Sequence, residues 1–237
     1  MEVSPVRNER GVETLARHFR ERILNGEIQP GTLLPNERDL VDRSGLSRGS
    51  VREALKVLET QGFLSTKLGR SGGRIARKPG AEIIRSSLRS VIEGQQIAFP
   101  SLIETIEVLE PSLAGLAALH REDGDLASIR RETRRLRLTS DPRRFLLANT
   151  RWHRTMAHAS HNTILIAVYD ALGPRLLDPH VAGFASTTVR AAVVDAVEKI
   201  EAAIVAGDVS AARRRMERHV RAYRDQVETL APSIIIL

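Results

Sequence analysis

Residues 34–76, LPNERDLVDRSGLSRGSVREALKVLETQGFLSTKLGRSGGRIA, constrain the fold more than any other part of the chain. Asn36 can cap a helix that has Asp39 at its third position, a relative of the capping box. Gly45 can take the left-handed conformation that ends this helix and turns the chain. Ser47 can then cap a second helix, whose apolar residues recur at spacings of three and four and must pack inward: Val51, Ala54, Leu55 and Leu58. The pattern predicts a helix-turn-helix.

A small hairpin is predicted directly after these helices. Residues 63–67 and 74–76 fit two short strands, and the glycine-rich segment LGRSGG between them fits a tight turn. Arg48 and Arg52 share one face near the start of the second helix, where arginine can bond guanine edges in the major groove and the helix N-terminus meets phosphate. A chance pattern with a solvated basic face is the alternative. Turn chemistry, helix period and hairpin nevertheless agree on a winged helix-turn-helix that binds double-stranded DNA.

Length and composition narrow the class of protein further. The chain has 237 residues, more than one small domain needs, so we expect a second domain. It has no cysteine, which excludes disulfides and thiolate metal sites. No apolar run is long enough to cross a membrane and the start lacks a signal-peptide core, so we expect a cytoplasmic protein. Residues 1–78 carry 15 Lys and Arg against 10 Asp and Glu, which places positive charge where DNA phosphate would bind.

The expected fold is mainly α. We predict a flexible N-terminus at 1–10, a winged helix-turn-helix domain with a small β wing at 11–77, a linker at 78–81, an all-α helical bundle at 82–230 and a tail at 231–237. A helix at 12–24 precedes the helix-turn-helix, and the bundle helices are expected near 81–93, 100–120, 124–138, 142–159, 162–173, 187–206 and 209–230. A bundle of this length can enclose a core and a ligand pocket between its helices.

The N-terminal motifs resemble a known family. LPNERDL, GLSRGSVREALKVLETQGFL and GRSGG are similar to the winged-helix domain of the GntR superfamily of bacterial transcription factors, from about Leu15 through Ala76. In that family the arginine of the first helix, the arginines and the small hydroxyl residue that open the recognition helix, and the wing-tip glycine contact DNA. The resemblance therefore implies DNA contacts from Arg38, Arg48, Ser50, Arg52 and Gly69, and we also expect Ser47, the cap of the recognition helix, to take part.

The C-terminal motifs extend the resemblance over nearly the whole chain. LEPSLAGLAAL, DPRRFLLANTRWHRTMAHASHNTIL and AGDVSAARRRMERHV resemble the FCD domain, which defines the FadR-type branch of the superfamily. This resemblance implies a domain that binds a small, often carboxylate-bearing metabolite, forms a homodimer interface, and commonly holds a divalent metal through an Asp or Asn and three histidines. We expect a metabolite-responsive repressor that binds a pseudo-palindromic operator as a dimer, and not an enzyme.

The implied metal ligands match this chain only in part. Asn149 and His153, four residues apart on one predicted helix, match the first two ligand positions, and His219 matches the last. Val197 stands at the position of the remaining histidine, eleven residues before Asp208. A bound zinc, nickel or manganese ion would have two imidazoles, one amide oxygen and no anionic protein ligand, which is a weak coordination sphere.

Several interpretations of these residues stay open. Asn149, His153 and His219 fit a metal site, a metal-free polar pocket for the effector, or core polar groups with satisfied hydrogen bonds. Ile106 stands where the family often has an arginine that can pair with an effector carboxylate. A metal-assisted hydrolase is a rival function, but no nucleophile elbow, phosphate-binding glycine loop or HExxH appears. An architectural DNA binder without an effector is another, against which the long helical domain argues.

Overall fold

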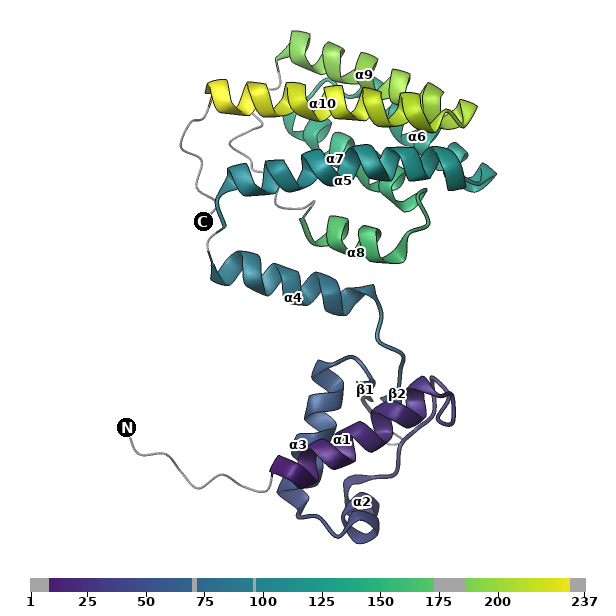
Figure 1. The fold of residues 1–237 in the computed structure, drawn as a ribbon, viewed down its shortest axis with the longest axis vertical. Helices are drawn as coiled ribbons and strands as arrows, with labels where there is room; N and C mark the ends of the chain where they lie inside the picture. Colours follow the sequence, from purple (N-terminus) through teal and green to yellow (C-terminus); the bar gives the residue numbers. More distant parts are fainter. Residues whose placement is uncertain (1–8, 70–71, 96, 173–185, 231–237) are drawn as a thin grey trace. The chain divides into compact units, whose positions relative to one another are not determined.

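The computed structural model describes residues 9–69, 72–95, 97–172 and 186–230 (Figure 1). The chain divides into two compact units, Met1–Ile83 and Ile84–Leu237. The first unit contains a two-stranded sheet, and the second is built from helices throughout its described residues. The mainly α fold with a small β wing is therefore confirmed. No helix among the described residues combines the length and apolar character needed to cross a membrane.

The first unit has the order of a winged helix-turn-helix. Its elements are α1 (Glu9–Leu24), α2 (Glu37–Ser44), α3 (Arg48–Thr60), β1 (Leu64–Lys67) and β2 (Gly73–Ala76). The strands pair antiparallel, with Leu64 opposite Ala76 and Lys67 opposite Gly73. Helix α1 begins three residues before the predicted start, inside the segment expected to be a flexible N-terminus. Apolar spacing marks the packed face of a helix and leaves its ends undefined, which explains the difference.

The predicted caps hold this unit in shape. The Asn36 side chain accepts a hydrogen bond of 2.9 Å from the Asp39 N–H, and Gly45 ends α2 with a φ of 70°. The Ser47 hydroxyl accepts the Ser50 N–H at 3.1 Å and begins α3. The inward face of α3 then packs on α1 in one apolar core, made of Ala16, Phe19, Ile23, Val51, Ala54, Leu55 and Leu58 with neighbouring residues. Turn chemistry and apolar spacing thus act together to fix the angle between α2 and α3.

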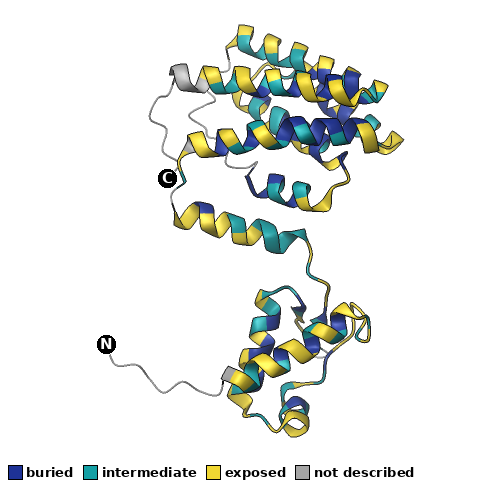
Figure 2. Cartoon of the chain, viewed as in Figure 1, coloured by how far each residue is buried: buried dark blue, intermediate teal, exposed yellow. Residues whose placement is uncertain are grey.

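The second unit is a helical bundle around α5. Its helices are α4 (Ala81–Gly94), α5 (Phe99–His120), α6 (Asp123–Leu138), α7 (Pro142–His158), α8 (Thr163–Leu172), α9 (Thr187–Ala206) and α10 (Val209–Leu230). Helix α5 packs against α7, α8, α9 and α10, and α6 packs against α7 and α9. Figure 2 shows the buried side of α5 and α10 facing the other bundle helices. The central position of α5 means that a side chain on its inner face meets several helices at once.

The core of the bundle contains Trp152 and Met156 on the inner face of α7. Both side chains are fully buried. The Trp152 indole N–H donates to the Thr133 hydroxyl at 2.8 Å, and that hydroxyl donates to the Ile129 carbonyl at 3.1 Å. Since the only polar atom of the indole has a partner, this large side chain is buried without an unsatisfied donor.

We expect Met156→Ala to lower the free energy of unfolding of the bundle by about 2–5 kcal/mol, because it removes fully buried apolar volume and leaves a cavity. Trp152 is the only tryptophan of the chain, so its fluorescence during urea unfolding follows the bundle alone. Leu138→Ala is the control, since Leu138 is 72% exposed, and its change should stay within about 0.5 kcal/mol. Equal destabilisation by both changes would contradict this description of the core.

Candidate DNA-binding surface and helical cavity

The predicted DNA contacts lie on the outside of the first unit. Arg38 on α2, Ser47, Arg48 and Arg52 at the start of α3, and Gly69 in the hairpin turn are all exposed, and Ser50 is half-buried. Arg38 and Arg48 have no ion-pair partner within the part of the chain that the structure describes. Gly69 has a φ of 119°, a backbone conformation that favours glycine over other residues. The guanidinium groups of Arg38 and Arg48 are therefore available for binding. The hairpin turn at Gly69 has no side chain of its own that would keep another molecule away from its backbone.

Glu37 connects the two helices of the helix-turn-helix with the wing. Its carboxylate oxygens lie 3.1 Å from Arg52 Nη2 and 3.0 Å from Arg74 Nη1, and Arg74 Nε lies 3.6 Å from Glu59. The hydrogen bond from Arg52 is the main reason why the pKa of Glu37 lies below its ordinary value, and the bond from Arg74 adds to it against the effect of burial. Glu37 thereby orients the Arg52 guanidinium. The pairing of Glu37 with Arg74 cannot be found from the sequence, because the two residues lie 37 positions apart without any local pattern.

The two serines at the start of α3 bond to each other. Ser47 Oγ and Ser50 Oγ are 2.9 Å apart, in addition to the capping bond that Ser47 accepts. Their hydroxyls therefore stabilise the start of the helix before any DNA is bound. The backbone N–H groups of this first turn and the exposed hydroxyl of Ser47 face outward at the positive end of the helix dipole, which suits a phosphate group.

A cavity of about 320 Å³ lies among α5, α7, α8, α9 and α10 of the second unit. Apolar side chains form most of its wall, among them Ile106, Leu146, Val189, Val193, Ala196 and Val220. All three polar residues predicted for the site, Asn149, His153 and His219, line it together. The cavity has the size and the mixed lining typical of a small-molecule site in a helical bundle.

Glu110 organises the polar end of the cavity. Its side chain is 4% exposed, and its two oxygens reach different helices: His153 Nδ1 lies 3.0 Å from Oε2, and the Tyr169 hydroxyl donates to Oε1 at 3.0 Å. The His153 and His219 rings stack with centroids 5.2 Å apart, and their Nε2 atoms are separated by 3.3 Å. None of the ligand positions implied by the family resemblance is acidic in this chain, yet a carboxylate lies directly beside His153. Glu110 stands 43 positions before His153, so only the packing of α5 against α7 reveals it.

Burial and neighbouring charges together shift the pKa values of these groups. Burial raises the pKa of Glu110, but the neighbouring His153 and His219 and the Tyr169 hydrogen bond outweigh it, so this pKa lies below its usual value. Burial and then the Glu110 charge raise the pKa of Tyr169 well above its ordinary value. Burial, with the nearby His153, lowers the pKa of His219 to about 4. At neutral pH the cavity therefore contains a carboxylate, a phenol that donates to it and a neutral His219.

The side-chain oxygen of Asn149 lacks a hydrogen-bond donor among the described residues. This atom, Oδ1, is buried. A buried polar atom without a partner costs about 1–3 kcal/mol, so such atoms in folded proteins usually meet a water or a bound molecule. Since Asn149 lines the cavity, a ligand there could supply the missing donor.

The residues present do not fit the metal that the family resemblance implies. Val197, at the position of the third histidine, is fully buried in the apolar core of the bundle and does not line the cavity. His153 directs one ring nitrogen toward Glu110 and the other toward His219. Within the described ranges, no group of three or more His, Cys, Asp or Glu side chains is arranged to hold a metal ion. The two imidazoles and one neutral amide oxygen that line the cavity are a weak coordination sphere for zinc, nickel or manganese.

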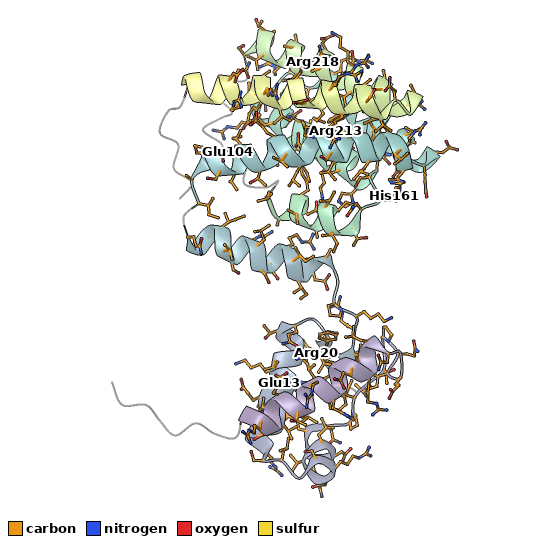
Figure 3. The ribbon with its side chains drawn as sticks, in the orientation of Figure 1. Glu13, Arg20, Glu104, His161, Arg213 and Arg218 are labelled. Atoms are coloured by element: carbon orange, nitrogen blue, oxygen red, sulfur yellow. The ribbon has the colours of Figure 1, made fainter. Side chains whose placement is uncertain are left out.

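Basic residues stand at the exposed edge of the cavity. Lys199 pairs with Asp195 at 2.6 Å, and the Arg215 guanidinium donates to the Lys199 carbonyl. Arg218, labelled on α10 in Figure 3, is exposed and has no ion-pair partner in the ranges that the structure describes. Glu110 is the buried charge of the cavity, and Arg215 and Arg218 leave the exposed edge with net positive charge beside the Lys199–Asp195 pair, which gives the cavity a charge direction.

Comparisons with known proteins agree with this architecture. The gntR family of bacterial regulatory proteins matches residues 12–72, and the FCD domain matches residues 101–222. The putative L-lactate dehydrogenase operon regulatory protein of Escherichia coli strain K12 is 27% identical over 88% of this chain and 83% of its own length. The transcriptional regulator LutR of Bacillus subtilis is 26% identical over 86% and 94%, and the repressor NanR of Salmonella bongori is 30% identical over 71% and 65%.

A solved structure supports the fold. The GntR protein of Streptococcus agalactiae superposes with a TM-score of 0.60 at 23% identity, covering 90% of this chain and 99% of its own. The FCD match alone spans more than half of the 237 residues. The chain therefore belongs to the gntR family of bacterial regulatory proteins that carry a C-terminal FCD domain, and it is a sequence-specific DNA-binding transcriptional regulator rather than an enzyme.

Proposed function

We propose that the protein is a metabolite-responsive repressor that binds a pseudo-palindromic operator as a homodimer. The observation that carries this proposal is the cavity of about 320 Å³ with the unpartnered Asn149 oxygen, present in the same chain as an exposed basic helix-turn-helix. A dimer places two recognition helices in successive major grooves, and its two-fold symmetry matches that of the operator.

The proposed DNA contacts divide by chemistry. Arg48 and Arg52 on α3 are suited to guanine edges, and the start of α3 with Ser47 and Ser50 is suited to phosphate. Arg38 on α2 and Gly69 in the hairpin turn would contact the backbone on either side. The pairing of Arg52 with Glu37 supports a base contact, because a guanidinium already held in one orientation loses less freedom on binding.

The charge direction of the cavity indicates the class of effector. A carboxylate would be repelled by Glu110 at the buried end and attracted by Arg218 at the exposed edge. The Asn149 oxygen requires a donor such as a hydroxyl or an amine. A small organic acid that carries such a donor meets both requirements. The E. coli relative named for an L-lactate dehydrogenase operon makes L-lactate a reasonable first compound to test.

The effector would control DNA binding if its affinity differs between two arrangements of the dimer. An effector that binds one arrangement of the dimer more tightly shifts the population toward it, and by linkage operator DNA then lowers the affinity for the effector by the same factor. Typical coupling free energies of about 1–3 kcal/mol correspond to roughly 5- to 150-fold changes in affinity. Repression relieved by a metabolite is the mode that the family resemblance favours.

We expect Arg52→Ala to cost about 1–3 kcal/mol of discrimination at one base pair, because a bidentate bond to guanine is lost there. Operator sequences can be selected from random DNA and each base pair then varied, with affinity measured by fluorescence anisotropy at fixed salt. Lys56→Ala, at an exposed position of the same helix, is the control for lost charge alone. A uniform loss across all sequences would instead make Arg52 a phosphate contact.

We expect protein purified without chelator to be a metal-free dimer in native mass spectrometry, and titration with zinc or nickel chloride to show no site at micromolar concentration. Val197 cannot coordinate, so only two imidazoles and the neutral Asn149 amide remain as ligands, which is the physical reason. One metal per chain, lost on His219→Ala, would contradict the metal-free site. A monomer at micromolar concentration would contradict the proposed dimer.

A further inference from the structure

A second cluster of charges lies directly beside the cavity residues, on the same two helices. It is centred on Asp170 of α8, whose side chain is only 9% exposed. Arg154 donates to both oxygens of Asp170, at 2.8 and 3.1 Å, and His158 Nε2 lies 3.4 Å from Oδ1. Arg85 of α4 completes the cluster, with Nη1 at 3.6 Å from Oδ2. Asp170 therefore joins α7, α8 and α4 through one carboxylate.

The cavity and this cluster are connected by neighbouring residues. On α8, Tyr169 donates to Glu110 in the cavity while the next residue, Asp170, holds the cluster. On α7, His153 lies against Glu110 while the next residue, Arg154, bonds Asp170. Adjacent side chains on a rigid helix move together. A shift of Glu110 that changes its bonds to Tyr169 and His153 therefore displaces both partners of the Arg154–Asp170 pair.

Helix α4 is attached to α8 at few points. Its Leu88 and Ile92 pack in a small apolar cluster with Leu102, Val168 and Leu172, which meets the main core of the bundle only through Leu109 among the described residues. The Arg85–Asp170 pair is the electrostatic part of this attachment, and at 3.6 Å it is longer than the Arg154 bonds. Along the chain, α4 follows wing strand β2 after only residues 77–80. Helix α4 is thus the first helix along the chain after the winged helix-turn-helix.

We propose that Asp170 is the positioning residue through which the state of the cavity controls how firmly α4 is held against α8. The inference rests on the proposed function in one respect, namely that an effector occupies the cavity. When the Glu110–Tyr169 bond is intact, Asp170 is presented to Arg85 and α4 is held. When a ligand or a substitution breaks that bond, α8 shifts, the long Arg85 pair weakens and α4 opens more often.

Amide hydrogen exchange of the full-length protein tests this without DNA or effector. Tyr169→Phe removes only the hydroxyl that bonds Glu110. It should raise exchange over residues 84–94 by about two- to ten-fold, the factor that one net hydrogen bond represents. Arg85→Gln should raise exchange over the same residues, and the double variant should add little to either change, since both act through one contact.

A control variant and the double variant show whether Asp170 transmits the state of the cavity to α4 or only stabilises the bundle. Arg137→Gln breaks a different ion pair, the 3.5 Å contact of Arg137 with Glu198 between α6 and α9, and it should leave α4 exchange at the wild-type value. Arg85 is 36% exposed, so its substitution leaves the bundle core intact even if Asp170 itself cannot be replaced. Unchanged α4 exchange in Tyr169→Phe, or fully additive effects in the double variant, would overturn the inference. Either result would leave the proposed effector function standing, because that function fails only if no compound changes operator binding.

Discussion

The second unit depends on one buried carboxylate. Glu110 projects from the central helix α5 and holds His153 of α7 and Tyr169 of α8, so three helices meet at a single charge. Removing one partner of a buried pair typically costs about 3–5 kcal/mol, because the remaining charge stays unpaired. The same arrangement keeps a cavity open, since side chains that bond to each other across helices do not collapse into the space beside them. Stability and ligand binding thus rest on the same contact.

In the first unit, a carboxylate at the surface likewise joins separate elements. Glu37 ties α2 to α3 and β2 through Arg52 and Arg74, so the recognition helix and the wing keep a fixed relation. Both units therefore place an acidic residue where separate elements must be held at a set angle. The difference lies in exposure: Arg52 is 70% exposed, so its guanidinium can meet a base edge while Glu37 holds it, whereas Glu110 is only 4% exposed. One arrangement suits DNA recognition, and the other suits a selective pocket.

Local patterns predicted most of the fold. The caps at Asn36 and Ser47 and the left-handed Gly45 have purely local causes, so the helix-turn-helix could be read from neighbouring residues. Asn149, His153 and His219 were placed in one site by helical spacing and family resemblance, and they do line one cavity. Glu110, Tyr169 and Glu37 could not be found in this way. Their partners lie on other helices or strands, and such pairing follows from tertiary packing, which no periodicity records.

If the proposed function is correct, occupancy of the cavity controls the affinity for operator DNA. The direct test is operator affinity at fixed salt with and without each member of a panel of small hydroxy and amino acids, chosen by their effect on thermal unfolding. We predict that at least one acid raises the melting temperature and lowers operator affinity. Asn149→Leu should abolish both effects while leaving operator affinity without the acid unchanged. Operator affinity that stays constant with every acid that binds, or an Asn149→Leu variant that responds like the wild type, would contradict the account.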